Sequence, residues 1–148
     1  MAGYTAESDP DKTSRAIGKE LPISPKFSRE ICTMLRGKKV TVAVRILEEI
    51  IDLKRPVPIK RFNTGVAHKK NIGPGRYPQK AAKAILRVVE SARNNAEYKG
   101  LDAENMKVAV VTTNLGRTMK GSMPRAYGRA TQWNQQTANI EVILEELE

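Results

Sequence analysis

The stretch that decides the fold is KVAVVTT (107–113), followed by NLGRTMKGSMPRAYGRA (114–130) and, further on, by NIEVILE (139–145). The first segment alternates β-branched residues and is typical of a strand. The last segment fits a strand or a helix by its spacing, and the first strand's need for a partner favours a strand. The middle segment is basic and rich in glycine, with almost nothing to bury. We therefore predict a hairpin over 107–146 whose arms extend beyond the core and need an external surface.

The segment before the hairpin, 79–98, has the clearest helical spacing in the chain, and a glycine follows it as a C-terminal cap. Its buried stripe is expected to be Ile85, Val88, Val89, Ala92 and Ala96. Another face carries Lys80, Lys83 and Arg87, and no acidic side chain before Glu90 neutralises their charge. We interpret this row as facing phosphates, because it adjoins the basic segment described next.

Residues 56–78, PVPIKRFNTGVAHKKNIGPGRYP, show no apolar period. A loop of this length without its own core is uncommon in a compact domain and is usually functional or disordered. Its aromatic residues, Phe62 and Tyr77, stand beside Arg61 and Arg76. That pairing suits base stacking next to phosphate contacts.

Two helices are predicted upstream of this loop. The first begins at Ser24-Pro25, with the serine as N-cap and the proline in the first turn, and Gly37 closes it. The second runs over 41–54 and stops before Pro56. Their apolar stripes are expected to be Phe27, Ile31, Met34 and Leu35 in the first helix, and Val40, Val44, Leu47, Ile50 and Ile51 in the second.

The first 15 residues are polar and aperiodic, which predicts a disordered or clamped leader. Residues 16–21 can form a short strand. A length of 148 residues allows one domain with a modest core and is too short for two full-sized ones. We therefore predict a leader over 1–15 and a single α+β domain over 16–148.

The net charge of +10 is concentrated in one part of the chain. Residues 54–99 contain twelve basic and two acidic side chains, whereas the tail from residue 135 has four glutamates and no base. Such an excess of one sign repels itself unless a polyanion lies nearby. Nucleic acid fits best, because neutralised phosphates release condensed counterions. A membrane surface fits less well, since no basic segment has a continuous apolar face and no run approaches the roughly 18–20 apolar residues of a span.

Several classes of site are excluded by residue counts. The single cysteine, Cys32, excludes an internal disulfide, and the single histidine, His68, excludes a Cys/His metal cage. Cys32 lies beside an apolar stripe and is expected to be a small buried hydrophobe. The glycine-rich run NIGPGR (71–76) lacks the Gly-Lys-Ser/Thr ending of a nucleotide-binding loop. No group of residues combines a nucleophile, a base and an orienting residue, so we expect no enzyme activity, cofactor or metal.

Two segments carry a family resemblance. PQKAAKAILRVVESARNNAE (78–97), and PRAYGRA (124–130) followed by TANI (137–140), resemble the signatures of the large-subunit ribosomal protein twenty-two family, called seventeen in eukaryotes. The resemblance covers about 14–146 and implies three helices on a three-stranded antiparallel sheet, with a long projecting β-hairpin. The long basic loop and the short acidic tail are similar to archaeal members.

The resemblance also implies a function. Such a protein would be a cytoplasmic structural constituent of the large ribosomal subunit, one copy per ribosome, without enzymatic activity. It would bind large-subunit ribosomal RNA, support assembly and contact neighbouring large-subunit proteins. Its hairpin would line the polypeptide exit tunnel next to the nascent polypeptide. By position, 116–128 would form the tip, with Arg117, Met119 and Lys120 nearest the lumen.

The residues expected to contact RNA are basic or aromatic. Arg125 and Arg129 match the signature arginines and would clamp the RNA backbone, while Trp133 is a candidate for stacking or packing within QWNQQ (132–136). Recognition would rest on phosphates and RNA shape, with little base reading. The full set is Lys60, Arg61, His68, Lys69, Lys70, Arg76, Tyr77, Lys80, Lys83, Arg87, Arg117, Lys120, Arg125, Arg129 and Trp133.

One function of a different class also accounts for a basic hairpin. A free architectural DNA-binding protein would insert its arm into the minor groove, and Pro124 would fit as a wedge. That hypothesis leaves residues 56–78 unexplained and requires a dimer interface that the sequence does not indicate.

Overall fold

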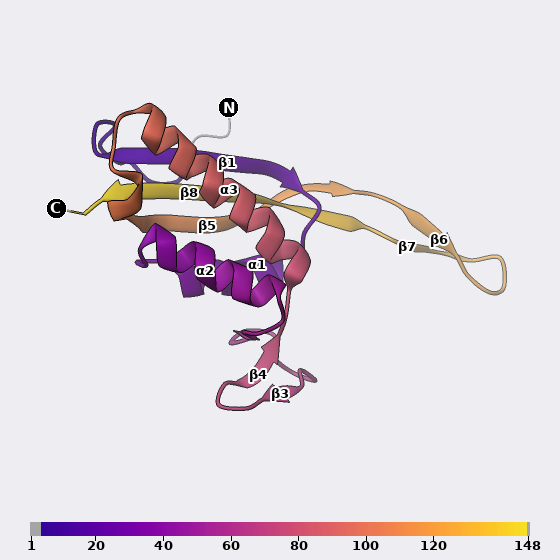
Figure 1. Ribbon diagram of the computed structural model, residues 1–148. Coiled ribbons are helices and arrows are strands. Elements are labelled where there is room, and N and C mark those ends of the chain that lie inside the picture. The colour runs from indigo at the N-terminus through magenta and orange to yellow at the C-terminus, as the bar shows by residue number, and fades with distance from the viewer. Residues whose placement is uncertain (1–3, 148) are drawn as a thin grey trace.

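The computed structural model describes residues 4–147, so residues 1–3 of the predicted leader and Glu148 of the predicted domain lie outside the described residues. Helices and antiparallel strands give the α+β class that the sequence predicts (Figure 1). The elements are β1 (Thr13–Leu21), α1 (Pro25–Leu35), α2 (Val40–Ile51), β2 (Val57–Pro58), β3 (His68–Lys69), β4 (Gly73–Arg76), α3 (Gln79–Tyr98), the 3-10 turn η1 (Ala103–Asn105), β5 (Met106–Met119), β6 (Ser122–Pro124), β7 (Ala130–Gln132) and β8 (Gln135–Glu146).

The main sheet has the order β1-β8-β5, with every neighbouring pair antiparallel. The central strand, β8, is therefore hydrogen-bonded along both edges. Residues 137–144 of β8 are buried on both faces except for Asn139, which is half-buried. The segment 139–145, whose spacing fits either a strand or a helix, is thus a strand, as predicted from its need to pair with 107–113.

The core lies between this sheet and the three helices. Its largest fully buried side chains include Ile31 and Leu35 of α1, Leu47 and Ile50 of α2, and Ile85 of α3. A Cβ atom added at Gly18 of β1 would lie 2.7 Å from Cγ2 of Val88, so only glycine lets α3 approach the sheet this closely.

The helices follow the sequence closely. α3 has the predicted bounds, and its whole predicted stripe is buried. α1 begins at Pro25 as expected, although Ser24 makes no side-chain cap bond, and Gly37 has the left-handed φ of +75°. α2 ends at Ile51, three residues before its predicted end. The chain turns out of the helix there, because Leu53 adopts a φ of +62°.

The N-terminal strand is longer than predicted. β1 begins at Thr13, so residues 13–15 of the predicted leader belong to the sheet. Buried hydrogen bonding explains why polar residues enter the strand: the Ser14 hydroxyl donates to the Ala92 carbonyl of α3 at 2.6 Å. Earlier in the leader, Thr5 is hydrogen-bonded to Glu141 of β8.

The predicted loop 56–78 contains three short strands. Its strands form a second small sheet in the order β2-β4-β3. Val57 and Ile59 are buried and fix this sheet to the domain. Strands of two to four residues are too short to show a period of two, which is why the sequence pattern did not indicate them.

The hairpin leaves the domain where β5 and β8 outrun the helices (Figure 1). Its ladder extends to the pair Met119–Gln135 and continues in the pairing of β6 with β7. The chain reverses over 125–129, where the Arg125 N–H donates to the Arg129 carbonyl at 2.7 Å and Tyr127 and Gly128 have positive φ. No helix within residues 4–147 is long and apolar enough to cross a membrane.

Candidate nucleic-acid interface

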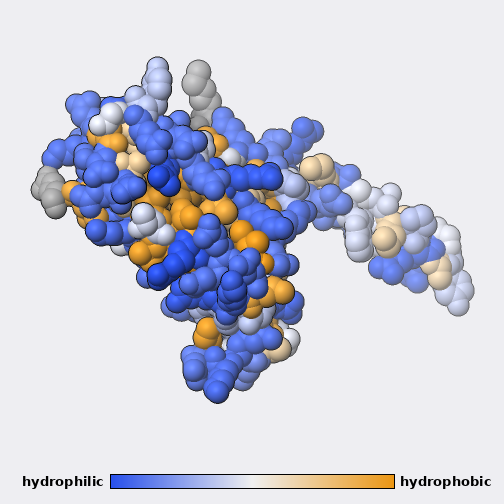
Figure 2. All heavy atoms as spheres, in the orientation of Figure 1, coloured by the Kyte–Doolittle hydropathy of each residue, from blue (hydrophilic) through white to orange (hydrophobic). Residues whose placement is uncertain are grey.

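Two projections carry most of the predicted RNA-contacting residues. We call them the basic lobe (residues 56–78) and the arm (residues 116–136). Both leave the domain from the end at which α3 begins (Figure 1). Figure 2 shows that hydrophobic atoms gather over the body of the domain, whereas the lobe is mostly hydrophilic.

Cations and aromatic rings are paired in the basic lobe and beside it. Arg61 lies 5.3 Å from the centre of the Phe62 ring, as its sequence position suggested, and Lys26 of α1 lies 4.8 Å from the same ring. Phe62 remains 63% exposed. Tyr77 is contacted by Lys69 at 5.5 Å rather than by its chain neighbour Arg76. This arrangement holds an accessible ring among cations, which suits both stacking and phosphate contact.

Arg76 instead lies 5.9 Å from the ring of Phe27 in α1. The sequence pattern assigned Phe27 to the buried stripe of the first helix, but its side chain is only half-buried. Phe27 lies where α1 meets β4. Its neighbour Arg76 comes nearly fifty residues later in the chain. Sequence spacing alone therefore gave no signal that Phe27 belongs to the interface.

The predicted row on α3 forms one exposed face. Lys80, Lys83 and Arg87 line a groove of about 430 Å³ between α3 and β1, whose other wall includes Ala16 and Ile17. The first turn of α3 contains no acidic residue, and no side chain caps its N-terminus. The helix dipole and the row thus add positive potential at the same end of the domain.

Arg117, Met119 and Lys120 lie before the reversal of the hairpin, and their position nearest the tunnel lumen stays a prediction. Arg117 and Met119 belong to β5, whose ladder continues to the pair Met119–Gln135. The Thr137 hydroxyl donates to the Arg117 carbonyl at 2.7 Å, which ties this part of β5 to β8. The three residues therefore lie at the neck of the arm, and the reversal occurs five residues further along the chain.

Arg125 and Arg129 flank that reversal. Nε of Arg125 donates to the Thr131 hydroxyl at 3.2 Å, and Tyr127 between the arginines is almost fully exposed. Trp133, also in the arm, is 53% exposed, and its backbone N–H donates to the Gly121 carbonyl at 2.7 Å. Its ring is therefore not part of a hydrophobic core, which leaves stacking as the better of the two predicted roles.

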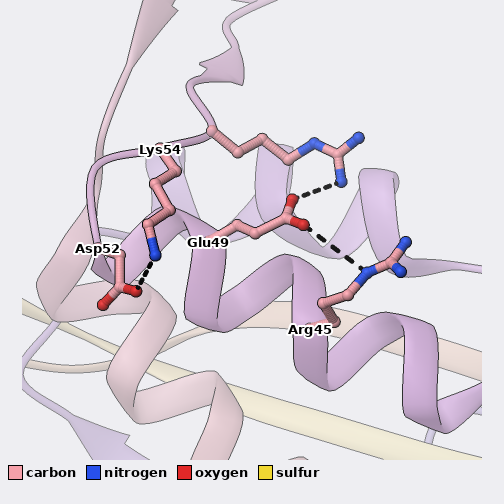
Figure 3. Close-up of polar contacts among 5 residues, drawn as sticks. Arg45, Glu49, Asp52 and Lys54 are labelled. Atoms are coloured by element: carbon pink, nitrogen blue, oxygen red, sulfur yellow. Dashed lines mark hydrogen bonds and ion pairs between the residues drawn. The ribbon is translucent and has the colours of Figure 1, made fainter.

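The cations of the predicted set are available to a partner. None of them forms an ion pair with a carboxylate of residues 4–147. The cations near α2 behave differently (Figure 3): Glu49 pairs with Arg45 at 3.7 Å and with Arg55 at 3.0 Å, and Asp52 pairs with Lys54 at 2.9 Å. The hydrogen bond and charge of Asp52 raise the pKa of Lys54. Glu49 and Asp52 are thus matched by neighbouring cations, whereas the lobe, the α3 row and the arm are left with an unbalanced positive charge.

Reactive side chains are few. Burial raises the pKa of Cys32 to about 11, and its Sγ lies 3.1 Å from the Thr113 hydroxyl, so the thiol stays protonated at neutral pH. His68 is exposed on β3. Among residues 4–147, no three His, Cys, Asp or Glu side chains are grouped so that they could hold a metal ion.

Comparison with known proteins assigns this arrangement to a family. Residues 16–145, which span the lobe, α3 and the arm, match the family described as Ribosomal protein L22p/L17e. The chain belongs to this family. The resemblance carried by the two sequence signatures is therefore confirmed, and within this L22p/L17e chain the signatures form α3 and the reversal of the hairpin.

The L22p/L17e relatives include archaeal proteins that match over nearly their whole length. The large ribosomal subunit protein uL22 of Methanothrix thermoacetophila is 53% identical over 137 residues, which cover 90% of each chain. The protein of the same name from Methanocaldococcus jannaschii is 48% identical and covers 97% of this chain and 94% of its own. The protein of the same name from Methanocella arvoryzae is 45% identical, and the match covers 98% of this chain and 97% of its own. The archaeal character expected from the loop and the tail is thereby confirmed.

Proposed function

We propose that this chain is a structural constituent of the large ribosomal subunit and binds large-subunit ribosomal RNA. Membership of the L22p/L17e family and the names of the archaeal relatives support this function. The observation that carries it is the set of exposed cations on the basic lobe, on α3 and on the arm, which no carboxylate of residues 4–147 neutralises. A polyanion supplies the missing negative charge.

The arm indicates how such binding works. All of its residues are exposed except Gly116 and Met123, which are half-buried. An isolated two-stranded ribbon is marginally stable in water, so an arm of this kind needs an external surface to hold it. Large-subunit RNA and neighbouring ribosomal proteins would provide that surface. Binding at both projections would connect separate RNA segments, which is how the protein would support subunit assembly.

We further propose that the arm extends along the wall of the polypeptide exit tunnel, within reach of the nascent polypeptide. Because the chain reverses over 125–129, Arg125, Tyr127 and Arg129 would lie deepest in the tunnel. The neck residues Arg117, Met119 and Lys120 would stay closer to the domain. The protein would act in the cytoplasm as one copy per ribosome, and it would need no cofactor and catalyse no reaction.

The alternative, a free DNA-binding protein, gains no support from the fold. Pro124, the expected wedge, is paired with Ala130 in the ladder of β6 and β7 and so is not at the apex of the arm. That hypothesis leaves the basic lobe unexplained. The lobe is a folded part of the domain and is anchored by the buried Val57.

Sedimentation of native lysate through a sucrose gradient, before and after a high-salt wash, tests the proposed function. We expect the protein to stay on the large subunit in stoichiometric amount through the wash, because a protein held only by surface charge is removed by salt. Recovery mainly in light fractions, or on chromosomal DNA, would contradict the proposal.

A further inference from the structure

An open hollow lies at the neck of the arm. It has a volume of about 730 Å³ and is lined by the start of α1, the first turn of α3 and the base of the arm. We call it the neck pocket. Its volume is in the range of about 300–1,000 Å³ that is usual for pockets holding small organic groups. Most of the arm beyond it is exposed, so the neck pocket is the place where the arm and the domain can enclose a ligand together.

Two aromatic rings form one wall of the neck pocket. Phe27 and Tyr77 line it, and both also line a second groove, of about 490 Å³, beside the basic lobe. The cations that contact these rings, Arg76 and Lys69, line only that second groove. The rings are therefore held by cations from the lobe side, and their surfaces toward the neck pocket are left to a ligand. A flat aromatic group is the ligand that such surfaces bind best.

Residues with side-chain amides also line the neck pocket. Asn134, Gln135 and Gln136 come from the base of the arm, and Gln79 comes from α3. The NH₂ group of Gln79 donates to the Ile51 carbonyl at 2.6 Å, so its amide oxygen remains free to accept a hydrogen bond. Amides both donate and accept, which suits the mixed polar edge of a nucleobase.

The charge of the residues that line the neck pocket also suits a nucleotide. Lys80 lines the neck pocket, and among the described residues that line it none is acidic. Lys80 also borders the groove that holds Lys83 and Arg87, so the cationic row on α3 begins at the mouth of the pocket. A nucleotide in the pocket would place its phosphate at Lys80, and the RNA chain would continue along this row.

We propose that the neck pocket binds one unstacked nucleotide of large-subunit ribosomal RNA, with its base against Phe27 and Tyr77 and its polar edge on the amides of the arm. This proposal rests on the proposed function and adds base recognition to the phosphate contacts expected from the sequence. Single-stranded loops and bulges are where RNA presents such splayed bases. Because the walls come from the domain and from the arm, the bound base also fixes the direction in which the arm leaves the domain.

The test is chemical probing of protein-free large-subunit ribosomal RNA from the source organism, with reagents that modify the Watson–Crick edges of bases. The full chain is added as the wild type, as Tyr77→Ala and as Tyr77→Phe. We expect one nucleotide that the wild type and Tyr77→Phe protect and that Tyr77→Ala leaves reactive, together with about tenfold weaker binding by Tyr77→Ala. Tyr98→Ala removes an exposed ring at the end of α3, outside the pocket and outside both projections, and it should leave that nucleotide protected.

A second variant changes the part of the neck pocket that comes from the arm and leaves the domain unchanged. Asn134→Ala combined with Gln136→Ala changes only exposed side chains of the arm, so folding is preserved. This double variant should leave the Watson–Crick edge of the same nucleotide reactive. Thermal unfolding of each variant checks that the fold is retained.

Three results would contradict the proposal. Every nucleotide protected by the wild type could remain protected with both pocket variants, or the sensitive nucleotide could respond equally to Tyr98→Ala. Either result overturns the neck pocket and leaves the proposed function standing. A wild-type chain that protects no nucleotide and does not bind the RNA would overturn the proposed function and the neck pocket together.

Discussion

Thr5 and Glu141 are joined across 136 residues of sequence by two hydrogen bonds. The backbone N–H of Thr5 donates to one carboxylate oxygen of Glu141 at 2.8 Å, and its hydroxyl donates to the other at 2.6 Å. Glu141 lies on the central strand and is only 2% exposed, yet no cation forms an ion pair with it within residues 4–147. The leader thus supplies the two short hydrogen bonds of this buried acid, whereas the sheet adds only the Thr112 hydroxyl of β5, which donates to Glu141 at 3.5 Å.

The first prediction follows from this contact. Thr5→Ala removes a hydroxyl donor from a buried carboxylate, and we expect the free energy of unfolding to fall by about 1.5–3 kcal/mol. Urea denaturation measures the change. Thr33→Ala is the control, because Thr33 is an exposed helical residue of α1 and alanine favours a helix. Equal stability of Thr5→Ala and the wild type would mean that the leader does not hold Glu141 in solution.

The contact of Gly18 with Val88 gives a second prediction. Gly18→Ala forces the new methyl group against Cγ2 of Val88, and overpacking of this kind costs about 1–3 kcal/mol of stability. Val88→Ala removes the nearest obstructing methyl group and leaves Cδ1 of Leu21, which would lie 2.9 Å from the new methyl group. The double variant should therefore be more stable than the sum of the two single effects predicts. Strictly additive effects in thermal or urea unfolding would contradict the close approach of α3 to β1.

Cys32 gives a prediction about pH. Its pKa of about 11 in the folded protein exceeds the ordinary value of 9.0, so the native thiol is protonated at pH 8 and alkylation by iodoacetamide should be slow. In denaturant the same thiol should react readily. Since the folded protein holds the proton more tightly than the unfolded chain, Cys32 contributes stability below about pH 9, which is lost as the pH rises to about 11. Rapid labelling of the native protein at pH 8 would contradict the burial of Cys32.

The signature arginines give a prediction about salt. Arg125→Ala and Arg129→Ala should each weaken binding to ribosomal RNA broadly and lower the slope of log affinity against log salt by about 0.7–0.9, which corresponds to one lost phosphate contact. Arg45→Ala is the matched control, because Arg45 pairs with Glu49 on α2, outside the lobe and the arm. Filter binding at several salt concentrations measures the slopes. Slopes unchanged by both arm variants would remove these arginines from the phosphate-contacting set.

The sequence predicts some elements better than others for physical reasons. α3 has its predicted bounds because twenty residues of amphipathic spacing, followed by a glycine, carry enough local information to specify a helix. The strands β2, β3 and β4 were not predicted, because pairs such as Val57 with Arg76 are decided by tertiary contacts and not by local pattern.

The position of the hairpin's reversal shows the same limit. It depends on how far the ladder of β5 and β8 extends, and that register is set by the pairing of Met119 with Gln135. The neck pocket is harder still to predict. Its walls bring together Phe27, Tyr77 and Asn134, which lie on three separate parts of the chain. Composition identified the basic surface, but only the fold shows which aromatic and amide side chains share one hollow.

The order of the main sheet has a consequence for biogenesis. Of the strands that residues 4–147 form, β8 is the last to be synthesised, yet it lies between β1 and β5 and supplies every hydrogen-bonded partner that these two strands have in that sheet. During translation the sheet therefore cannot close until β8 has emerged, because β1 and β5 are not neighbours. Until then, the newly made chain carries two unpaired strands and an exposed excess of positive charge. The interval before β8 pairs is thus when this polypeptide most needs protection from nonspecific contacts with RNA.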